Sequence, residues 1–321
     1  MIWFWILIGA AALLILADIA VSAALFMTSI PRKRLKFGPL DHAPSGAEAN
    51  EKRNVWRRSE QEAREWAETV HSEELRITSG DGLRLYATWF PAENACKTVV
   101  CLHGYLSNGY NDFGSLLKFY HDAGLNVLLV DQRAHNRSEG RHIGFGVLER
   151  YDCRRWIEFL NGRGVREIYL HGISMGASAA LMASGLELPE NVRGIIADCG
   201  FTSAWDEFAG VLKAVYRLPE FPVLHTASLI CKIFAGYGFR DVSTLDIMRA
   251  QKRPVLFIHG DADNFVPTWM TLKNHDACIA PKRLLITKNA AHGESRFAEP
   301  ERFISAISDF TGINKEAENV E

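Results

Sequence analysis

A serine between two glycines is the first feature of this sequence whose residue types and spacing suggest chemistry. Gly172, Ser174 and Gly176 lie in the segment LHGISMGASAA and match G-x-S-x-G, a tight strand-to-helix turn that raises a serine hydroxyl above a sheet. Glycine is needed at both flanks because a Cβ there would meet neighbouring backbone in so tight a turn. The spacing predicts that Ser174 is a nucleophile if a base and an acid lie beside it.

Two later segments offer the base and the acid. Asp261 and Asp263 follow the apolar run PVLFIHG, and His292 follows RLLITK. Reactive groups of open parallel sheets gather beyond the carboxyl ends of the strands, so these side chains are expected near Ser174. An imidazole that takes the serine proton, and a carboxylate that fixes the imidazole tautomer, would activate the hydroxyl. Asp198, at the end of another apolar run, remains an alternative acid.

Eight strand-like runs alternate with helical patterns from Glu74 onward. The runs are ELRIT, LRLYATWF, TVVCLHG, NVLLVD, EIYLHG, GIIADCG, PVLFIHG and RLLITK. Several are apolar on both faces, which predicts a mostly parallel sheet covered by helices on both sides. The first two runs are too close together for an intervening helix and should form an antiparallel hairpin. Helices are expected near 113–123, 148–161, 174–185 and 301–311.

Composition excludes several classes of function. The chain has 321 residues, 48% of them hydrophobic, enough for one large catalytic domain with appendages. A net charge of −2 without a basic stripe argues against a nucleic-acid partner. The six cysteines are dispersed, which suggests a reducing compartment. Metal-ligand spacings and a Walker loop are absent from the sequence, and only half of a dinucleotide fingerprint occurs at Gly144, so no metal and no cofactor are expected.

Residues 1–31 form an apolar run that predicts a membrane anchor. The run exceeds the ~20 residues that a spanning helix needs and stops at PRKRLK. A signal peptide is the alternative, but no lysine or arginine precedes the run. Asp18 interrupts it, and because a carboxylate at mid-bilayer costs ~3 kcal/mol, we expect this residue near an interface or protonated.

Positive charge follows the apolar run and predicts its orientation. Arg32, Lys33, Arg34 and Lys36 come directly after it, and such flanks tend to stay in the cytoplasm. The catalytic domain is therefore expected on the cytoplasmic face of the cell membrane, attached by a single span.

Residues 32–73 are predicted to form a polar linker that contains an amphipathic helix. Its apolar stripe comprises Val55, Trp56, Ala63, Trp66 and Val70. We expect the stripe to pack on the catalytic domain, and a helix lying on the membrane surface is the alternative.

Six motifs together make the chain similar to the α/β-hydrolases, and more narrowly to membrane-anchored bacterial serine hydrolases of the serine-aminopeptidase-like or esterase-like group. They are CLHGYLSN, DQRAHNRSEG, GISMG, ADCGFTS, HGDADNFVP and NAAHGES. The resemblance covers residues 74–312, followed by a polar tail at 313–321. It implies an α/β fold with an eight-stranded, mostly parallel sheet, helices on both faces and a small helical cap after the sixth strand.

The resemblance also assigns roles. It implies a triad of Ser174, Asp263 and His292, with Asp263 preferred to Asp261 because the family's acid precedes V-P by three residues. It implies an oxyanion hole made by the backbone N–H groups of Tyr105 and Met175. The chain departs from the family in one loop, where Ala134 and Asn136 stand in place of glycines. Asparagine tolerates the left-handed conformation, so the loop is expected to keep its shape.

The segment 203–240 is the predicted cap. Its apolar residues, which either roof an acyl pocket or pack as plain core, are Trp205, Phe208, Leu212, Val215, Tyr216 and Phe221. Trp205 and Phe208, with Phe265 beside the acid, are the predicted substrate contacts.

These features predict a membrane-anchored serine hydrolase that cleaves an ester or thioester with an apolar, small-molecule or lipid-like acyl part. A serine peptidase and an acyltransferase remain alternatives, because the same triad serves all three. A non-catalytic binding protein on the same fold is disfavoured by the intact motifs. The sequence leaves the oligomeric state open.

Overall fold

The computed structural model describes residues 1–36 and 47–313, and within them all eight predicted strands join one sheet. The strand order is β1-β2-β4-β3-β5-β6-β7-β8. The strands are β1 (Glu73–Thr78), β2 (Arg84–Phe90), β3 (Lys97–Leu102), β4 (Leu125–Asp131), β5 (Glu167–Ile173), β6 (Val192–Asp198), β7 (Val255–Gly260) and β8 (Lys282–Thr287). The predicted α/β-hydrolase architecture is confirmed. Most of the predicted tail, from residue 314 onward, lies outside the described residues.

Strand direction divides the sheet into two parts. β1 and β2 form the predicted antiparallel hairpin, and β2 also runs antiparallel to β4. The remaining neighbours, from β4 through β8, are parallel. Every residue of β4 and of β7 is buried, which explains why these strands read as continuous apolar runs.

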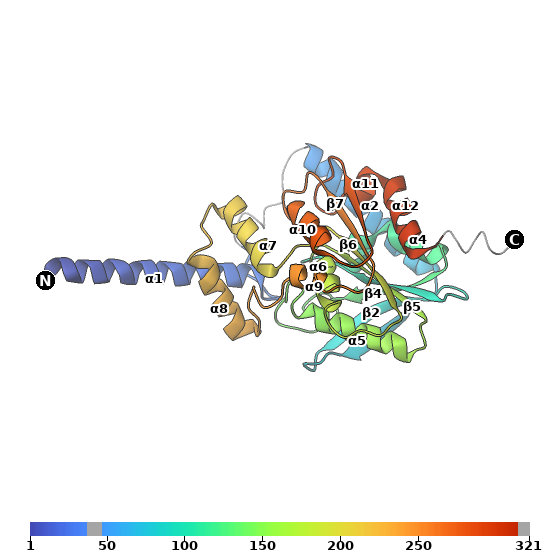
Figure 1. The fold of residues 1–321 in the computed structure, drawn as a ribbon, viewed down its shortest axis with the longest axis horizontal. Helices are drawn as coiled ribbons and strands as arrows, with labels where there is room; N and C mark the ends of the chain where they lie inside the picture. Colours follow the sequence, from blue (N-terminus) through green and yellow to red (C-terminus); the bar gives the residue numbers. More distant parts are fainter. Residues whose placement is uncertain (37–46, 314–321) are drawn as a thin grey trace.

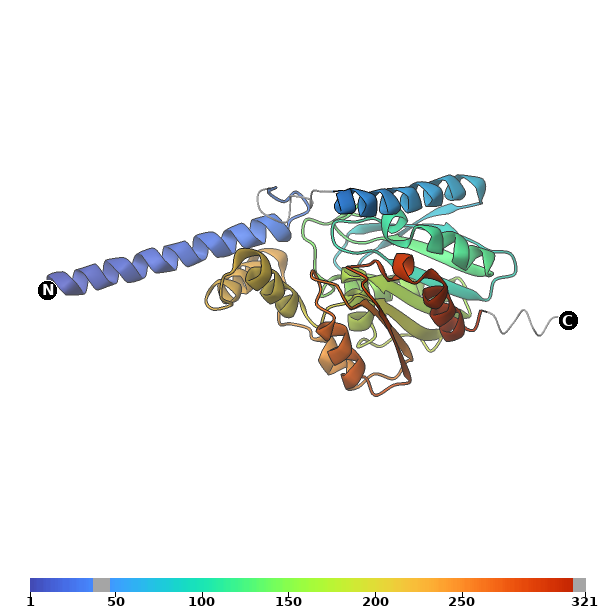
Figure 2. The same ribbon diagram turned by 90° about the horizontal axis from the view of Figure 1, so that it is seen from above.

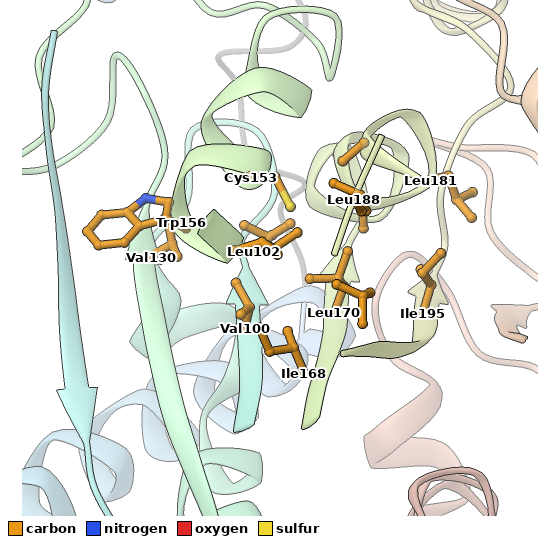
Figure 3. Packing of buried hydrophobic residues seen from close by; sticks show 14 of the residues in the cluster. Val100, Leu102, Val130, Cys153, Trp156, Ile168, Leu170, Leu181, Leu188 and Ile195 are labelled. Atoms are coloured by element: carbon orange, nitrogen blue, oxygen red, sulfur yellow. The ribbon is translucent and has the colours of Figure 1, made fainter. Parts of the chain in front are cut away.

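Helices cover both faces of the sheet (Figures 1 and 2). On one face, α5 (Glu149–Gly162) and α6 (Met175–Ala183) bury their apolar sides, and Figure 3 shows Trp156 of α5 beside Val130 and Cys153 of α5 beside Leu102. On the other face lie α4 (Ser115–Asp122), α12 (Pro300–Thr311) and part of α2 (Ala47–Thr69). Short helices complete the domain: α3 (Gly109–Phe113), α9 (Thr244–Met248), α10 (Trp269–Ala277) and α11 (Ser295–Ala298).

The amphipathic helix α2 packs on the catalytic domain, as its apolar stripe predicts. Ala63 is buried in the core on the α4 side, and Trp66 and Val70 pack against it. Trp56 meets Phe297 edge to face, with ring centroids 5.1 Å apart. The prediction for Val55 is wrong: its side chain is exposed, because it lies off the face that meets the domain.

Helix α1 (Ile2–Ser29) projects from the domain, and the part of α1 near the carboxyl end of this helix meets the cap (Figure 1). The cap comprises α7 (Ala204–Val211), the π-helix η2 (Leu212–Tyr216) and α8 (Val223–Ala235). Within the described residues, α1 alone is long and apolar enough to cross a membrane, with a mean hydropathy of 2.5 over a window that is entirely unburied. A membrane span and a signal sequence both fit that description. Leu25, Phe26 and Ile30 are buried in one core cluster with the cap.

Candidate active site

Ser174 occupies the sharp turn between β5 and α6. It has a φ of 56°, a strained value for a residue with a Cβ. A Cβ on Gly172 would lie 2.2 Å from the carbonyl oxygen of Gly176, and one on Gly176 would lie 1.9 Å from that of Leu102. Both contacts are with backbone that cannot move aside. The turn therefore requires the two glycines that the sequence pattern contains.

The three predicted triad residues form one hydrogen-bonded chain. The Ser174 hydroxyl lies 2.8 Å from Nε2 of His292, and Nδ1 of His292 lies 2.7 Å from Oδ2 of Asp263. The three side chains follow β5, β8 and β7, at the carboxyl edge of the sheet. With Nδ1–H donating to the carboxylate, Nε2 is free to accept the serine proton.

Asp263 is held rigidly from three sides. Its Oδ1 accepts hydrogen bonds from the backbone N–H groups of Phe265 and Val266, each at 2.9 Å. Its Oδ2 also accepts a hydrogen bond from a second imidazole, that of His259, whose Nε2 lies 3.1 Å away. Burial opposes ionisation of this carboxyl, but the hydrogen bonds from His259 and His292 outweigh burial and hold the pKa of Asp263 well below its usual range. Asp263 is thus a fixed anion, and His259, near the end of β7, helps to hold it in place.

The two alternative acids lie elsewhere. Asp261 accepts the backbone N–H of Asn289 at 2.6 Å and stands in a turn at the domain surface. Asp198 is fully buried, neither of its carboxylate oxygens has a hydrogen-bond partner among the described residues, and burial raises its pKa to about 6. The geometry therefore selects Asp263.

A buried thiol that the sequence analysis did not single out lies beside the triad. Cys199 directly follows β6, so the rule that located Asp263 would also have found it. Ligand atoms of Cys199, Asp263 and His292 lie within 4.8 Å of one another, a group able to hold a metal ion in principle. The imidazole and carboxylate of this group already bond each other, and burial raises the pKa of the Cys199 thiol to about 11. The hydrogen bond and the burial therefore account for the positions of these three side chains.

The surroundings of His292 favour its charged form. Burial by itself lowers the pKa of the imidazole, but the Cys199 sulfur and the Asp263 carboxylate act against burial and raise the pKa well above the ordinary value of 6.5. Since the thiol stays neutral near pH 7, the negative charge responsible is that of Asp263. The side chain of His292 is 27% exposed, so solvent screens part of this attraction.

The raised pKa of His292 predicts the pH dependence of activity. Only the neutral imidazole can take the serine proton, so kcat/KM for a soluble ester should rise with pH as His292 deprotonates. Because the pKa is raised, the midpoint of this acidic limb is expected above 6.5. The measurement is kcat/KM between about pH 5 and pH 9. A midpoint at or below the ordinary imidazole value would contradict the electrostatic role of Asp263.

Ser174 lies where two cavities meet. The larger, about 560 Å³, is lined by polar groups of α2 and of the loop after β3, by Tyr105, and by His292. The smaller, about 30 Å³, is apolar and lies under the cap. Residues that line this smaller cavity are Ser29, Tyr105, Phe145, Ser174, Met175, Phe201, Glu207, Phe208, Val211 and Phe265. Four of the predicted contacts, Tyr105, Met175, Phe208 and Phe265, are therefore beside the serine.

Trp205 does not line either cavity, and the expectation that it contacts substrate is corrected. Its indole N–H donates to Glu220 at 3.2 Å, and the Arg240 guanidinium lies 3.4 Å from its ring centroid. Phe208 is one turn along α7 and faces the cavity instead, stacked on Phe239 with centroids 4.4 Å apart. The two residues are one turn apart on the same side of α7, so apolar periodicity alone does not show which of them meets the cavity.

The loop after β3, which carries the predicted oxyanion-hole residue Tyr105, is held in place by its neighbours. A Cβ on Gly104 would lie 3.3 Å from the Ser174 Cβ, so the chain at Gly104–Tyr105 approaches the serine closely. The next residue, Leu106, donates its N–H to Nε2 of His135 at 3.1 Å. Ala134 and Asn136, on either side of His135, have φ values of 59° and 43°. The loop thus keeps the left-handed positions despite lacking glycine, as expected.

Two further sets of lining residues were missed from the sequence. Arg53, Trp56 and Arg57 of α2 line the larger cavity, although the sequence indicated only packing on the domain or a position on the membrane surface for this helix. Glu207 of α7 lines the apolar cavity, where burial raises its pKa to about 8 and leaves Oε2 without a partner. A buried acid on an apolar helix was the available signal for Glu207. No local signal places α2 at the site.

Comparison with known proteins identifies the family. A family model described as the alpha/beta hydrolase fold matches residues 97–221. The uncharacterized protein YqkD of Bacillus subtilis is 34% identical over 221 residues, which are 67% of this chain and 70% of YqkD. The uncharacterized protein YfhR of Escherichia coli K12 is 25% identical over 69% of this chain and 73% of its own length. The chain belongs to the α/β-hydrolase superfamily.

Solved structures show the same fold. The Pyrococcus furiosus esterase Pf2001 superimposes with a TM-score of 0.62 and 24% identity, covering 75% of this chain and 91% of the esterase. The esterase EaEST of Exiguobacterium antarcticum gives a TM-score of 0.57 and 19% identity over 74% and 99% of the two chains. These likenesses show that the chain has the fold of the α/β-hydrolases.

Proposed function

We propose that this protein is a serine hydrolase that cleaves a carboxylic ester or thioester through an acyl-enzyme on Ser174. The observation that carries the proposal is the continuous chain Ser174–His292–Asp263, with links of 2.8 and 2.7 Å, at the junction of two cavities. A purely binding protein would have no need for a strained serine hydrogen-bonded to an oriented imidazole.

In the first half of the reaction, the Ser174 oxygen attacks the acyl carbon while Nε2 of His292 takes the hydroxyl proton. Negative charge moves to the former carbonyl oxygen, where the N–H groups of Tyr105 and Met175 would stabilise it. The bond to the leaving group then breaks, and His292 returns the proton to the departing oxygen or sulfur. Asp263 stays ionised and stabilises the imidazolium throughout.

In the second half, water replaces the leaving group and the same residues act again. His292 takes a proton from water, the resulting oxygen nucleophile attacks the acyl carbon, and the proton passes to Ser174 as the acid departs. The start of an acyl part would occupy the small apolar cavity under Phe208 and Phe265, and the leaving group the larger cavity, whose lining includes Arg53, Arg57 and Glu60. An acyltransferase would differ only in the acceptor.

Peptidase activity is the second candidate, and Glu207 is the observation in its favour. A carboxyl beside Ser174 could receive the amine of an aminoacyl substrate, as an aminopeptidase requires. Its surroundings are aromatic, however, and a pKa of about 8 leaves this carboxyl mostly neutral near pH 7. A neutral acid suits an ester better than an ammonium group.

A substrate panel separates these functions. The purified full chain and its Ser174→Ala variant would be assayed with matched esters, thioesters and aminoacyl amides. Hydrolysis of esters or thioesters by the wild type alone is the expected result. Faster amide cleavage that Glu207→Gln abolishes would establish the peptidase instead, and turnover that persists in Ser174→Ala would overturn the proposed mechanism.

We also propose that α1 is a retained anchor and that the catalytic domain faces the cytoplasm. Leu25 and Phe26 of α1, and Ile30 directly after it, are buried in the cap core, so cleavage of α1 as a signal sequence would expose that core. Arg32, after the helix, donates hydrogen bonds to the carbonyls of Asn136 and Ser138 and fixes the domain close to the membrane.

The orientation is tested by adding protease to intact bacterial spheroplasts that express the full chain. Because the cationic flank should remain inside, the catalytic domain is expected to resist digestion until the cells are lysed. A cytoplasmic marker protein controls for leakage. Digestion without lysis would place the domain outside and reverse the orientation.

A further inference from the structure

Helix α1 and cap helix α8 are joined by specific contacts. The Ser22 hydroxyl donates to the carbonyl of Val223 at 2.9 Å, and the Thr226 hydroxyl donates to Asp18 at 2.6 Å. Asp18, whose place in an apolar run the sequence left unexplained, thus has a partner on the cap. Figure 1 shows α8 lying across α1 near the carboxyl end of the latter.

The outer side of the cap carries an exposed apolar surface. We call it the cap surface, and it comprises Phe221, Leu229, Ile233 and Phe234, which are 72%, 59%, 67% and 66% exposed. Large apolar side chains at such exposure on a short helix mark a membrane or partner contact. The lysine of α8, Lys232, is turned toward Asp241, with which it forms an ion pair at 3.2 Å.

The position of the cap surface along α1 indicates that a bilayer covers it. From Ile2 to Ile19, α1 has 18 residues. They span about 27 Å at 1.5 Å per residue, close to the ~30 Å hydrocarbon core. Because α8 contacts Asp18 and Ser22, it lies where α1 would leave the hydrocarbon. The cap surface is therefore continuous with the apolar surface of the candidate span and lies at the level of the membrane interface.

A further cavity lies between α1 and the cap. It measures about 170 Å³ and is almost wholly apolar. Its lining residues are Val21, Ala24, Leu25, Thr28, Leu212, Tyr216 and Leu218. Thr28 and Leu212 are the chain neighbours of Ser29 and Val211, which line the apolar cavity at Ser174. The linings of the two cavities share no residue but include neighbouring residues at 28–29 and 211–212, so both cavities lie against the contact between the carboxyl end of α1 and the cap.

We propose that the substrate is a long-chain acyl ester of a membrane lipid, whose acyl tail lies in the cavity between α1 and the cap while the bilayer covers the cap surface. This inference rests on the proposed esterase function and adds the substrate class. In this proposal the tail passes from the α1–cap cavity to Ser174 between Ser29 and Val211, and the polar remainder of the lipid occupies the larger cavity beside His292. The anchor then serves as one wall of the substrate site.

The first test fills the α1–cap cavity. Full-length protein in phosphatidylcholine vesicles would be assayed with a palmitoyl lipid ester in the bilayer and with a soluble butyryl ester. Ala24→Phe should lower kcat/KM for the palmitoyl ester about tenfold more than for the butyryl ester, because excluding even two methylenes from an apolar site costs about that factor. Ala11→Phe, on the exposed part of the same helix, should change neither rate.

Each outcome of this test is decisive. An equal effect of Ala24→Phe on both esters would overturn the inference while leaving the esterase proposal intact. Failure of the wild type to hydrolyse any ester would instead contradict the proposed function. Faster cleavage of soluble palmitoyl-coenzyme A than of the bilayer ester would show that the long-chain substrate comes from water and not from the membrane.

A second measurement tests the cap surface even if Ala24→Phe fails to fold. A nitroxide on Leu229→Cys, in a Cys96→Ser background, should be shielded from a water-soluble nickel chelate when the protein is in vesicles. The same label on Arg283→Cys, an exposed position of β8, should remain accessible. Equal accessibility at both positions would contradict the proposal that a bilayer covers the cap surface.

Discussion

The Ser174→Ala variant is expected to lose ester hydrolysis by about 10⁴-fold or more and to lose labelling by a fluorophosphonate probe. In the proposed mechanism the hydroxyl oxygen of Ser174 forms the bond to the acyl group, and neither Asp263 nor His292 can replace it. The loss should fall on kcat, because the cavities that bind the substrate remain. Initial rates with a butyryl ester and in-gel fluorescence of the probe provide the measurements.

Ser178→Ala is the matched control for this prediction. Ser178 lies one turn further along α6, and its hydroxyl donates to the carbonyl of Phe201 at 3.1 Å instead of to an imidazole. This variant should keep probe labelling and most of its activity, with some loss of thermal stability. Labelling that survives in Ser174→Ala, or disappears only in Ser178→Ala, would disprove the nucleophile assignment.

The second large effect is expected from Asp263→Asn. An amide at this position cannot hold Nδ1–H of His292 in the productive tautomer or stabilise the imidazolium, so kcat should fall by about 10⁴-fold. The backbone donors of Phe265 and Val266 can still bond the amide oxygen, which should preserve the fold. Steady-state kinetics together with a thermal melt separates the catalytic loss from unfolding.

Asp261→Asn tests whether the loss is specific. Asp261 contacts the backbone of Asn289 and no member of the triad, so its activity should stay within a few-fold of the wild type. If Asp261→Asn were the more severe variant, the assignment of the acid would be off by two residues. If both were mild, the charge on His292 would have another source, with Asp198 the nearest candidate.

The sequence by itself determined the sheet and the candidate catalytic residues. Each strand is a local apolar run, and the turn at Ser174 depends on glycines two residues away, so neighbours in the chain carry the signal. Asp263 and His292 follow strands whose carboxyl ends meet at one edge, which makes their proximity a consequence of topology. Even the left-handed loop at Ala134 and Asn136 kept its predicted shape.

Only the tertiary structure decided what surrounds these residues. Apolar periodicity marks one side of α7 but does not say whether Trp205 or Phe208 meets the substrate cavity, because that depends on how the whole cap is rotated over the sheet. The same holds for α2, where Trp56 combines packing on Phe297 with a place in the larger cavity. The bond from Thr226 to Asp18 joins residues 208 positions apart. No local pattern encodes such a contact, since it exists only once α1 and the cap are folded against each other.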